Sequence, residues 1–132
     1  MRFRHVLISE FHRRRSANPR YSLRSFSRHL SIDHSTLSQI LRGKRRVTAR
    51  TVRALGRRLR LPADAISELC ALEHESALLA AVDQPDFEAN SRWMSTRLGI
   101  PLDEVNVTLH RLLRKRTLAM TTRTRWQRVE GV

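Results

Sequence analysis

A run of polar side chains lies at residues 34–39, within a stretch that also carries hydrophobic residues at helical spacing. Gln39 could form two hydrogen bonds to an adenine, and Ser35 could bond to most bases or to a phosphate. His34 could donate to a guanine or contact a nucleic-acid backbone. The alternative is that these residues form only the solvated polar face of an exposed helix.

Basic residues surround this polar run. The candidates for phosphate contacts are Arg24, Arg42, Lys44, Arg45, Arg46 and Arg50. Any single arginine is usually solvated surface, but residues 1–60 hold 17 Lys or Arg and 2 Asp or Glu, a balance of +15. A positive block of this size favours a polyanionic partner, and nucleic acid is the default choice.

Two short helices joined by a tight turn are predicted to position the polar run, over residues 26–43. Asp33 is the natural N-cap of the second helix, and Gly43 can end it in a left-handed conformation. Ser31 lies in the turn between the helices. The hydrophobic residues that would hold the two helices together are Phe26, Leu30, Leu37, Ile40 and Leu41.

Further helices flank this pair. Residues 3–15 have hydrophobic residues at the helical interval and are predicted to form the first helix. Ser22 is the expected N-cap of the helix that follows. Thr48 is expected to cap a fourth helix, which Pro62 would end.

The layout of residues 3–61 resembles the Cro-type phage-repressor helix-turn-helix domain, the XRE family. The motif that carries the resemblance is the helix-turn-helix followed by residues 42–46 (RGKRR) and a fourth helix. Ser31 departs from the family pattern, because glycine usually occupies the turn. The resemblance implies DNA binding, usually as a two-fold dimer on near-palindromic sites. It also implies base contacts at His34, Ser35 and Gln39, with Thr36 and Ser38 beside them.

An acidic segment follows the basic block. Residues 61–90 hold no Lys or Arg and 7 Asp or Glu, and residues 62–83 read as one helix with an apolar stripe. The stripe could pack between the modules on either side of it within one chain, or it could pair with its symmetry mate. The segment at residues 62–86 could also bind a protein partner. We expect a homodimer, although the sequence does not locate its interface.

Residues 87–132 repeat the helix-turn-helix pattern. Alignment of residues 28–41 with residues 96–109 pairs Leu30 with Leu98, Ile32 with Ile100, Leu37 with Val105 and Leu41 with Leu109. Ser91 is expected to cap the first helix of this copy. Residues 117–120 and 126–129 are short strand candidates. A helix-turn-helix followed by a hairpin resembles the winged-helix superfamily.

This second copy is predicted to read bases poorly, since Asp103 and Glu104 in the first turn of its second helix would repel phosphate. Asn106 remains a candidate for a secondary DNA contact. Arg123 and Arg125, in the turn of the expected hairpin, are candidates for contacts to the DNA backbone. Packing or dimer formation is the alternative role for this part of the chain.

The expected fold is therefore mostly α, with three parts. Residues 1–61 form an XRE-type helix-turn-helix domain of four or five helices, and residues 62–86 form an acidic connecting helix. Residues 87–132 form a small winged-helix-like module with a short β-hairpin.

No catalytic or metal site is visible in the sequence. The six histidines show no metal-ligand spacing, and the single Cys70 excludes an intramolecular disulfide and a multi-cysteine zinc site. The 4 glycines form no phosphate-binding loop. We therefore expect neither an enzyme nor a bound cofactor.

The expected localisation is cytoplasmic and nucleoid-associated, without membrane contact. No run of 18 apolar residues exists, and the first eleven residues are too short and too charged for a signal peptide.

The leading hypothesis is a sequence-specific transcriptional regulator of double-stranded DNA, a repressor that binds an inverted repeat as a homodimer. The alternative is an antitoxin-type protein that binds a partner toxin and represses its own operon. RNA binding is a third hypothesis, but aromatic residues make up only 5% of the chain, which leaves few platforms for stacking bases.

Overall fold

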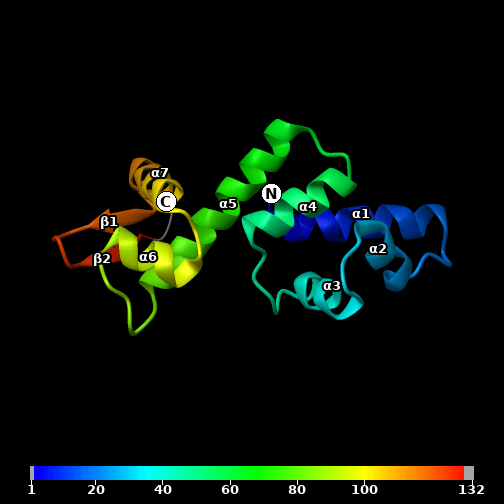
Figure 1. Ribbon diagram of the computed structural model, residues 1–132, viewed down its shortest axis with the longest axis horizontal. Helices are drawn as coiled ribbons and strands as arrows, with labels where there is room; N and C mark the ends of the chain where they lie inside the picture. The colour runs from blue at the N-terminus through cyan, green and yellow to red at the C-terminus, as the bar shows by residue number, and fades with distance from the viewer. Residues whose placement is uncertain (1, 130–132) are drawn as a thin grey trace. The chain divides into compact units, whose positions relative to one another are not determined.

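The computed structural model describes residues 2–129 (Figure 1). It divides after Glu73 into an N-terminal and a C-terminal unit. Helix α5 (Ala63–Val82) contributes residues 63–73 to the N-terminal unit and residues 74–82 to the C-terminal unit. The observed fold is mostly helical with one small hairpin, as predicted.

In the N-terminal unit, four helices precede α5: α1 (Phe3–Ala17), α2 (Leu23–Leu30), α3 (His34–Leu41) and α4 (Ala49–Arg58). The predicted helix-turn-helix is confirmed as α2 and α3. Its hydrophobic residues enter one core because they recur at helical spacing and so share a face. The fully buried members of that core are Phe3, Leu7, Phe26, Leu30, Leu37, Ile40 and Val52.

Three predicted N-caps are confirmed in this unit. The side chains of Ser22, Asp33 and Thr48 each accept a hydrogen bond from the backbone N–H of the third residue of α2, α3 and α4, respectively. The Asp33 carboxylate accepts from the N–H of Thr36 at 3.2 Å. Each cap satisfies a donor that has no partner within its helix, and so fixes where that helix begins.

Ser31 performs the task that glycine usually has in the turn. Its backbone is left-handed, with φ of 53°. Its N–H donates to the Arg28 carbonyl at 3.1 Å, and the N–H of Ile32 donates to the Ser27 carbonyl at 3.0 Å. This pair of hydrogen bonds is the Schellman motif, which ends α2 and redirects the chain into α3.

In the C-terminal unit, the end of α5 is followed by α6 (Ser91–Leu98), α7 (Leu102–Arg114), β1 (Leu118–Met120) and β2 (Trp126–Arg128). The two strands form an antiparallel hairpin, which confirms the predicted strand pair. Its register pairs Leu118 with Arg128, Ala119 with Gln127 and Met120 with Trp126. The core of this unit contains Leu78, Met94, Ile100, Val105, Leu109, Leu112 and Leu118.

The second helix-turn-helix follows the first in backbone geometry. Gly99, which aligns with Ser31, is also left-handed, with φ of 68°. Ser91 was expected to cap α6, and this prediction is wrong. Asn90 is the cap, because its amide oxygen accepts from the backbone N–H groups of Arg92 and Trp93, and Ser91 is already helical.

Candidate nucleic-acid interface

The structure places all five predicted base-contacting residues on α3, with unequal exposure. Ser35 and Gln39 lie four residues apart, and therefore on one face of the helix, and both are exposed. His34, Thr36 and Ser38 are half-buried. Only two of the five candidate residues, Ser35 and Gln39, are therefore exposed.

The six predicted phosphate-contacting residues are all exposed. They are Arg24, Arg42, Lys44, Arg45, Arg46 and Arg50. Across residues 2–129, none of the ion pairs with a carboxylate involves Arg24, Arg42, Lys44, Arg45 or Arg50. Their charges are therefore available to a polyanion.

The end of α3 folds the following loop back onto the helix. Gly43 is left-handed, with φ of 74°, and its N–H donates to the Ile40 carbonyl at 3.0 Å. The N–H of Lys44 donates to the Gln39 carbonyl at 2.9 Å, which completes a Schellman motif. Arg45 then reaches the Gln39 side chain, and its Nη1 donates to Gln39 Oε1 at 3.3 Å. Sequence reasoning missed this contact.

Arg4 holds the other side of this helix end, and sequence reasoning missed it too. Its Nε donates to the Leu41 carbonyl at 3.0 Å, one of the carbonyls that α3 leaves without an intrahelical partner. A Cβ atom on Gly43 would lie 3.3 Å from Arg4 Nε, so glycine also leaves room for this arginine. Arg4 is therefore a positioning residue for the end of α3.

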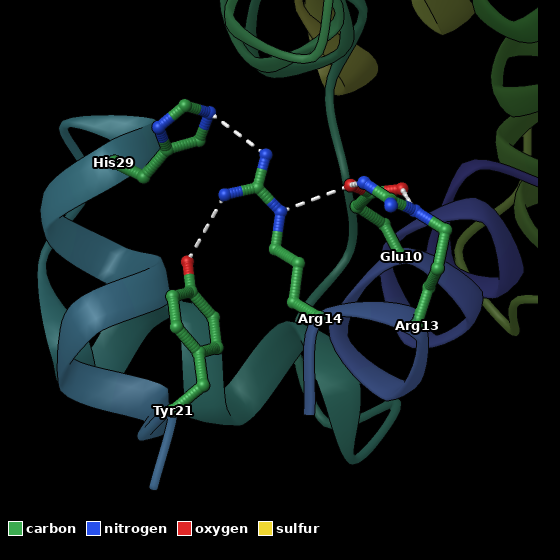
Figure 2. Close-up of polar contacts among 5 residues, drawn as sticks. All are labelled: Glu10, Arg13, Arg14, Tyr21 and His29. Atoms are coloured by element: carbon green, nitrogen blue, oxygen red, sulfur yellow. Dashed lines mark hydrogen bonds and ion pairs between the residues drawn. The ribbon is translucent and has the colours of Figure 1, made fainter. Parts of the chain in front are cut away.

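Arg14 joins α1 to the start and the end of α2 (Figure 2). Its Nε donates to Glu10 Oε1 at 2.9 Å, its Nη1 to the Tyr21 hydroxyl at 3.2 Å and its Nη2 to His29 Nε2 at 3.1 Å. Because a guanidinium only donates, His29 accepts through Nε2 in this arrangement. The hydrogen bonds of Arg14 hold α2 against α1, and α2 packs with α3 in one hydrophobic core.

The charges in this cluster shift three pKa values, those of Glu10, Arg13 and Arg14. The hydrogen bond from Arg13 lowers the pKa of the Glu10 carboxyl below its ordinary value, against the opposing effect of burial, and Arg14 adds to the lowering. Burial acts to lower the pKa of Arg14, but its hydrogen bonds to Glu10 and Tyr21 prevail and raise it. Glu10 is thus ionised, and its ion pairs are with Arg13 and Arg14 of the same helix.

The acidic segment presents less negative surface than its sequence indicates. Glu73 and Glu75 are buried, with 3% and 6% of their surface exposed. Glu73 pairs with Arg2 at 3.3 Å within the N-terminal unit, and Glu75 pairs with Lys115 at 2.8 Å within the C-terminal unit. Both carboxylates are buried and paired within the fold, so they are not available to a partner.

In the C-terminal unit, Asn106 lies exposed on α7, and Arg123 and Arg125 lie exposed in the hairpin turn. Asp103 and Glu104 occupy the first turn of α7, as predicted. The Glu104 carboxylate lies 3.6 Å from His74 Nε2 on α5. Asp103 and Glu104 align with Ser35 and Thr36, so the first turn of α7 carries carboxylates where that of α3 carries hydroxyl groups.

Within residues 2–129, no group of three His, Cys, Asp or Glu side chains could hold a metal ion. No helix in that range is both long enough and apolar enough to cross a membrane.

Comparison with known proteins supports the geometry of the N-terminal unit. No curated protein and no solved structure matches the chain. Residues 9–69 match a family model described as a helix-turn-helix domain, which contains α2, the left-handed Ser31 and α3 and is consistent with the XRE-type resemblance. Such a domain indicates a DNA-binding regulator. Over residues 9–69, the chain is therefore similar to helix-turn-helix domains.

Proposed function

We propose that this chain is a sequence-specific DNA-binding transcriptional regulator, a repressor that binds an inverted-repeat operator as a homodimer. The observation that carries the proposal is the exposed pair Ser35 and Gln39 on α3, together with six exposed basic residues on α2, on α4 and at the end of α3 and its following loop. Duplex DNA fits this surface, because its major groove admits one α-helix and its edges are lined with phosphates.

In this proposal α3 enters the major groove with Ser35 and Gln39 against the base edges. The basic residues and the backbone N–H groups at the start of α2 contact phosphates on either side and fix the register of the helix. Asn106, Arg123 and Arg125 of the C-terminal unit supply only secondary contacts. The half-sites of a dimer would lie about one helical turn of DNA apart, or a multiple of it.

The phosphate contacts predict a strong dependence of affinity on salt. If all six basic residues contact phosphates, the slope of log affinity against log salt should be about −5. Replacement of Arg42 by alanine should weaken binding to every duplex by a similar factor and bring this slope about one unit closer to zero. Fluorescence anisotropy at several salt concentrations measures both quantities.

Selection of bound sequences from a random duplex pool with the full chain tests the proposal. A two-fold symmetric consensus, together with a dimer on the selected duplex in sedimentation, is the expected result. Recovery of no enriched sequence would contradict sequence-specific binding. Displacement of the duplex by single-stranded RNA at equal concentration and fixed salt would favour an RNA-binding function instead.

A further inference from the structure

In the free protein, the side-chain amide oxygen of Gln39 already accepts a hydrogen bond from Arg45. The Nη1 of Arg45 donates to Gln39 Oε1 at 3.3 Å, and both side chains are exposed on the candidate reading surface. A guanidinium has donors only, so the oxygen of the amide, and not its nitrogen, must face Arg45. The Nε2 group of Gln39 is therefore left to make the outward contact.

We infer that Gln39 and Arg45 form one base-reading unit that selects guanine, an inference that rests on the function proposed above. With the amide oxygen engaged, the pair presents N–H donors: those of Gln39 Nε2 and the remaining ones of the Arg45 guanidinium. Guanine is the base whose major-groove edge carries two adjacent acceptors, N7 and O6, and no donor. Adenine sets a donor beside its acceptor, and thymine sets a methyl group beside its own.

The backbone around the pair keeps the two side chains together. The hydrogen bond from Lys44 N–H to the Gln39 carbonyl, at 2.9 Å, folds the loop against the end of α3. Arg4 holds that same end through the Leu41 carbonyl. Arg42 is also exposed, but within residues 2–129 its side chain forms no hydrogen bond to Ser35 or Gln39. Arg45 therefore differs from Arg42.

This assignment changes two expectations drawn from the sequence. Gln39 alone was expected to suit adenine, and Arg45 was expected to contact a phosphate. A planar fork of donors fits the guanine edge, which an arginine can bond in a bidentate way. The Gln39 oxygen acts here as the positioning group that keeps the fork beside α3.

The test measures affinities of the full-length chain for the selected duplex and for derivatives changed one base pair at a time. In the wild-type chain, replacement of one guanine by adenine should weaken binding about 5- to 150-fold, as for a bidentate base contact. Replacement of that guanine by 7-deazaguanine, which lacks the N7 acceptor, should also weaken it. Gln39→Ala and Arg45→Ala should each abolish both differences, and the double variant should behave like either single variant.

Two further variants separate charge from geometry. Arg45→Lys keeps the charge but loses the fork, so it should also lose the guanine preference while keeping most of the salt dependence. Arg42→Ala is the matched control and should weaken all duplexes equally while keeping that preference. All the replaced residues are exposed, and equal unfolding midpoints would show that the variants fold.

Three outcomes would overturn the inference. A uniform loss in Arg45→Ala with the guanine preference intact would make Arg45 a phosphate contact. A preference for adenine that disappears in Gln39→Ala would mean that the second lone pair of the amide oxygen reads the base. Failure of the wild-type chain to bind any duplex would overturn the proposed function itself, and with it this inference.

Discussion

Two arginines occupy backbone positions that glycine would fill with less strain. Arg60 and Arg116 have φ of 59° and 60°, and each directly follows the C-cap residue of its helix, α4 or α7. The N–H of Leu61 donates to the Gly56 carbonyl at 3.0 Å, so Arg60 is the left-handed residue of a Schellman motif. A left-handed residue with a Cβ atom costs about 1–2 kcal/mol.

Replacement of Arg60 by glycine should therefore stabilise the protein. Relief of the strain should outweigh the extra chain entropy of glycine, which costs about 0.5–1 kcal/mol. The free energy of unfolding should therefore rise by about 0.5–1 kcal/mol. Urea unfolding measures the change. The control is Arg53→Gly within α4, which should lower the free energy of unfolding by about 1 kcal/mol. Equal effects of the two changes would refute the strain at Arg60.

The lowered pKa of Glu10 predicts a dependence of stability on pH. Because the folded-state pKa lies below the ordinary value of 4.5, the ionised carboxylate adds stability above that value. This contribution is lost as the pH falls through the folded-state pKa. Glu10→Gln should lower the free energy of unfolding at pH 7 by about 0.2–1 kcal/mol, because its partners Arg13 and Arg14 are partly exposed.

Unfolding experiments at a series of pH values test this sign. The difference between the wild type and Glu10→Gln should shrink towards zero in acid. Glu68→Gln is the control, because the exposed Glu68 forms no ion pair within residues 2–129. A Glu10 difference that persists unchanged in acid would contradict the role of the ionised carboxylate.

At the scale of elements, α4 and α5 approach closely at a glycine. Gly56 is buried in α4, and a Cβ atom built on it would lie 2.9 Å from Cγ1 of Ile66 on α5. That distance is too short for two carbon atoms, so the absence of a side chain at residue 56 permits the packing. Helix propensity alone would favour alanine there by about 1 kcal/mol.

Gly56→Ala should therefore destabilise the wild-type protein by about 1–3 kcal/mol, because overpacking outweighs propensity. In an Ile66→Ala background, which removes the opposing Cγ1 atom, the same change should become neutral or stabilising. Thermal or urea unfolding of the four proteins in this double-mutant cycle measures the coupling. Additive effects would show that the close contact does not limit the packing.

Helix boundaries could be predicted from local signals, because a capping side chain or a left-handed glycine acts on only a few neighbouring residues. The caps at Ser22, Asp33 and Thr48 and the left-handed Gly43 could be read directly from residue type and spacing. Asn90 and Ser91 are both good capping residues, so type alone could not choose between them. Only the observed backbone, in which Ser91 is already helical, decides for Asn90.

Contacts between elements could not be predicted in this way. Glu73 and Glu75 were counted as acidic surface, but their partners Arg2 and Lys115 lie 71 and 40 residues away. The sequence likewise placed Gln39 and Arg45 in separate roles, because the turn that brings them together depends on how the end of α3 is held. The candidate site was therefore predictable as a set of residues, and its internal geometry was not.

For the whole molecule, the two helix-turn-helix copies both have a left-handed residue in the turn, and they differ in charge. Helix α3 lies in a block with 17 Lys or Arg and 2 Asp or Glu, whereas the first turn of α7 contains Asp103 and Glu104. Carboxylates stabilise a helix N-terminus but repel phosphate. The central claim is therefore that the N-terminal unit reads DNA through α3 and the loop that follows it.

Backbone amide NMR of the ¹⁵N-labelled full-length chain, titrated with the selected duplex, tests that claim most directly. The largest changes in amide chemical shift should fall in residues 33–46, with smaller changes at the start of α2 near Ser22. Shift changes concentrated in residues 102–125 of the C-terminal unit, with residues 33–46 unaffected, would contradict the account.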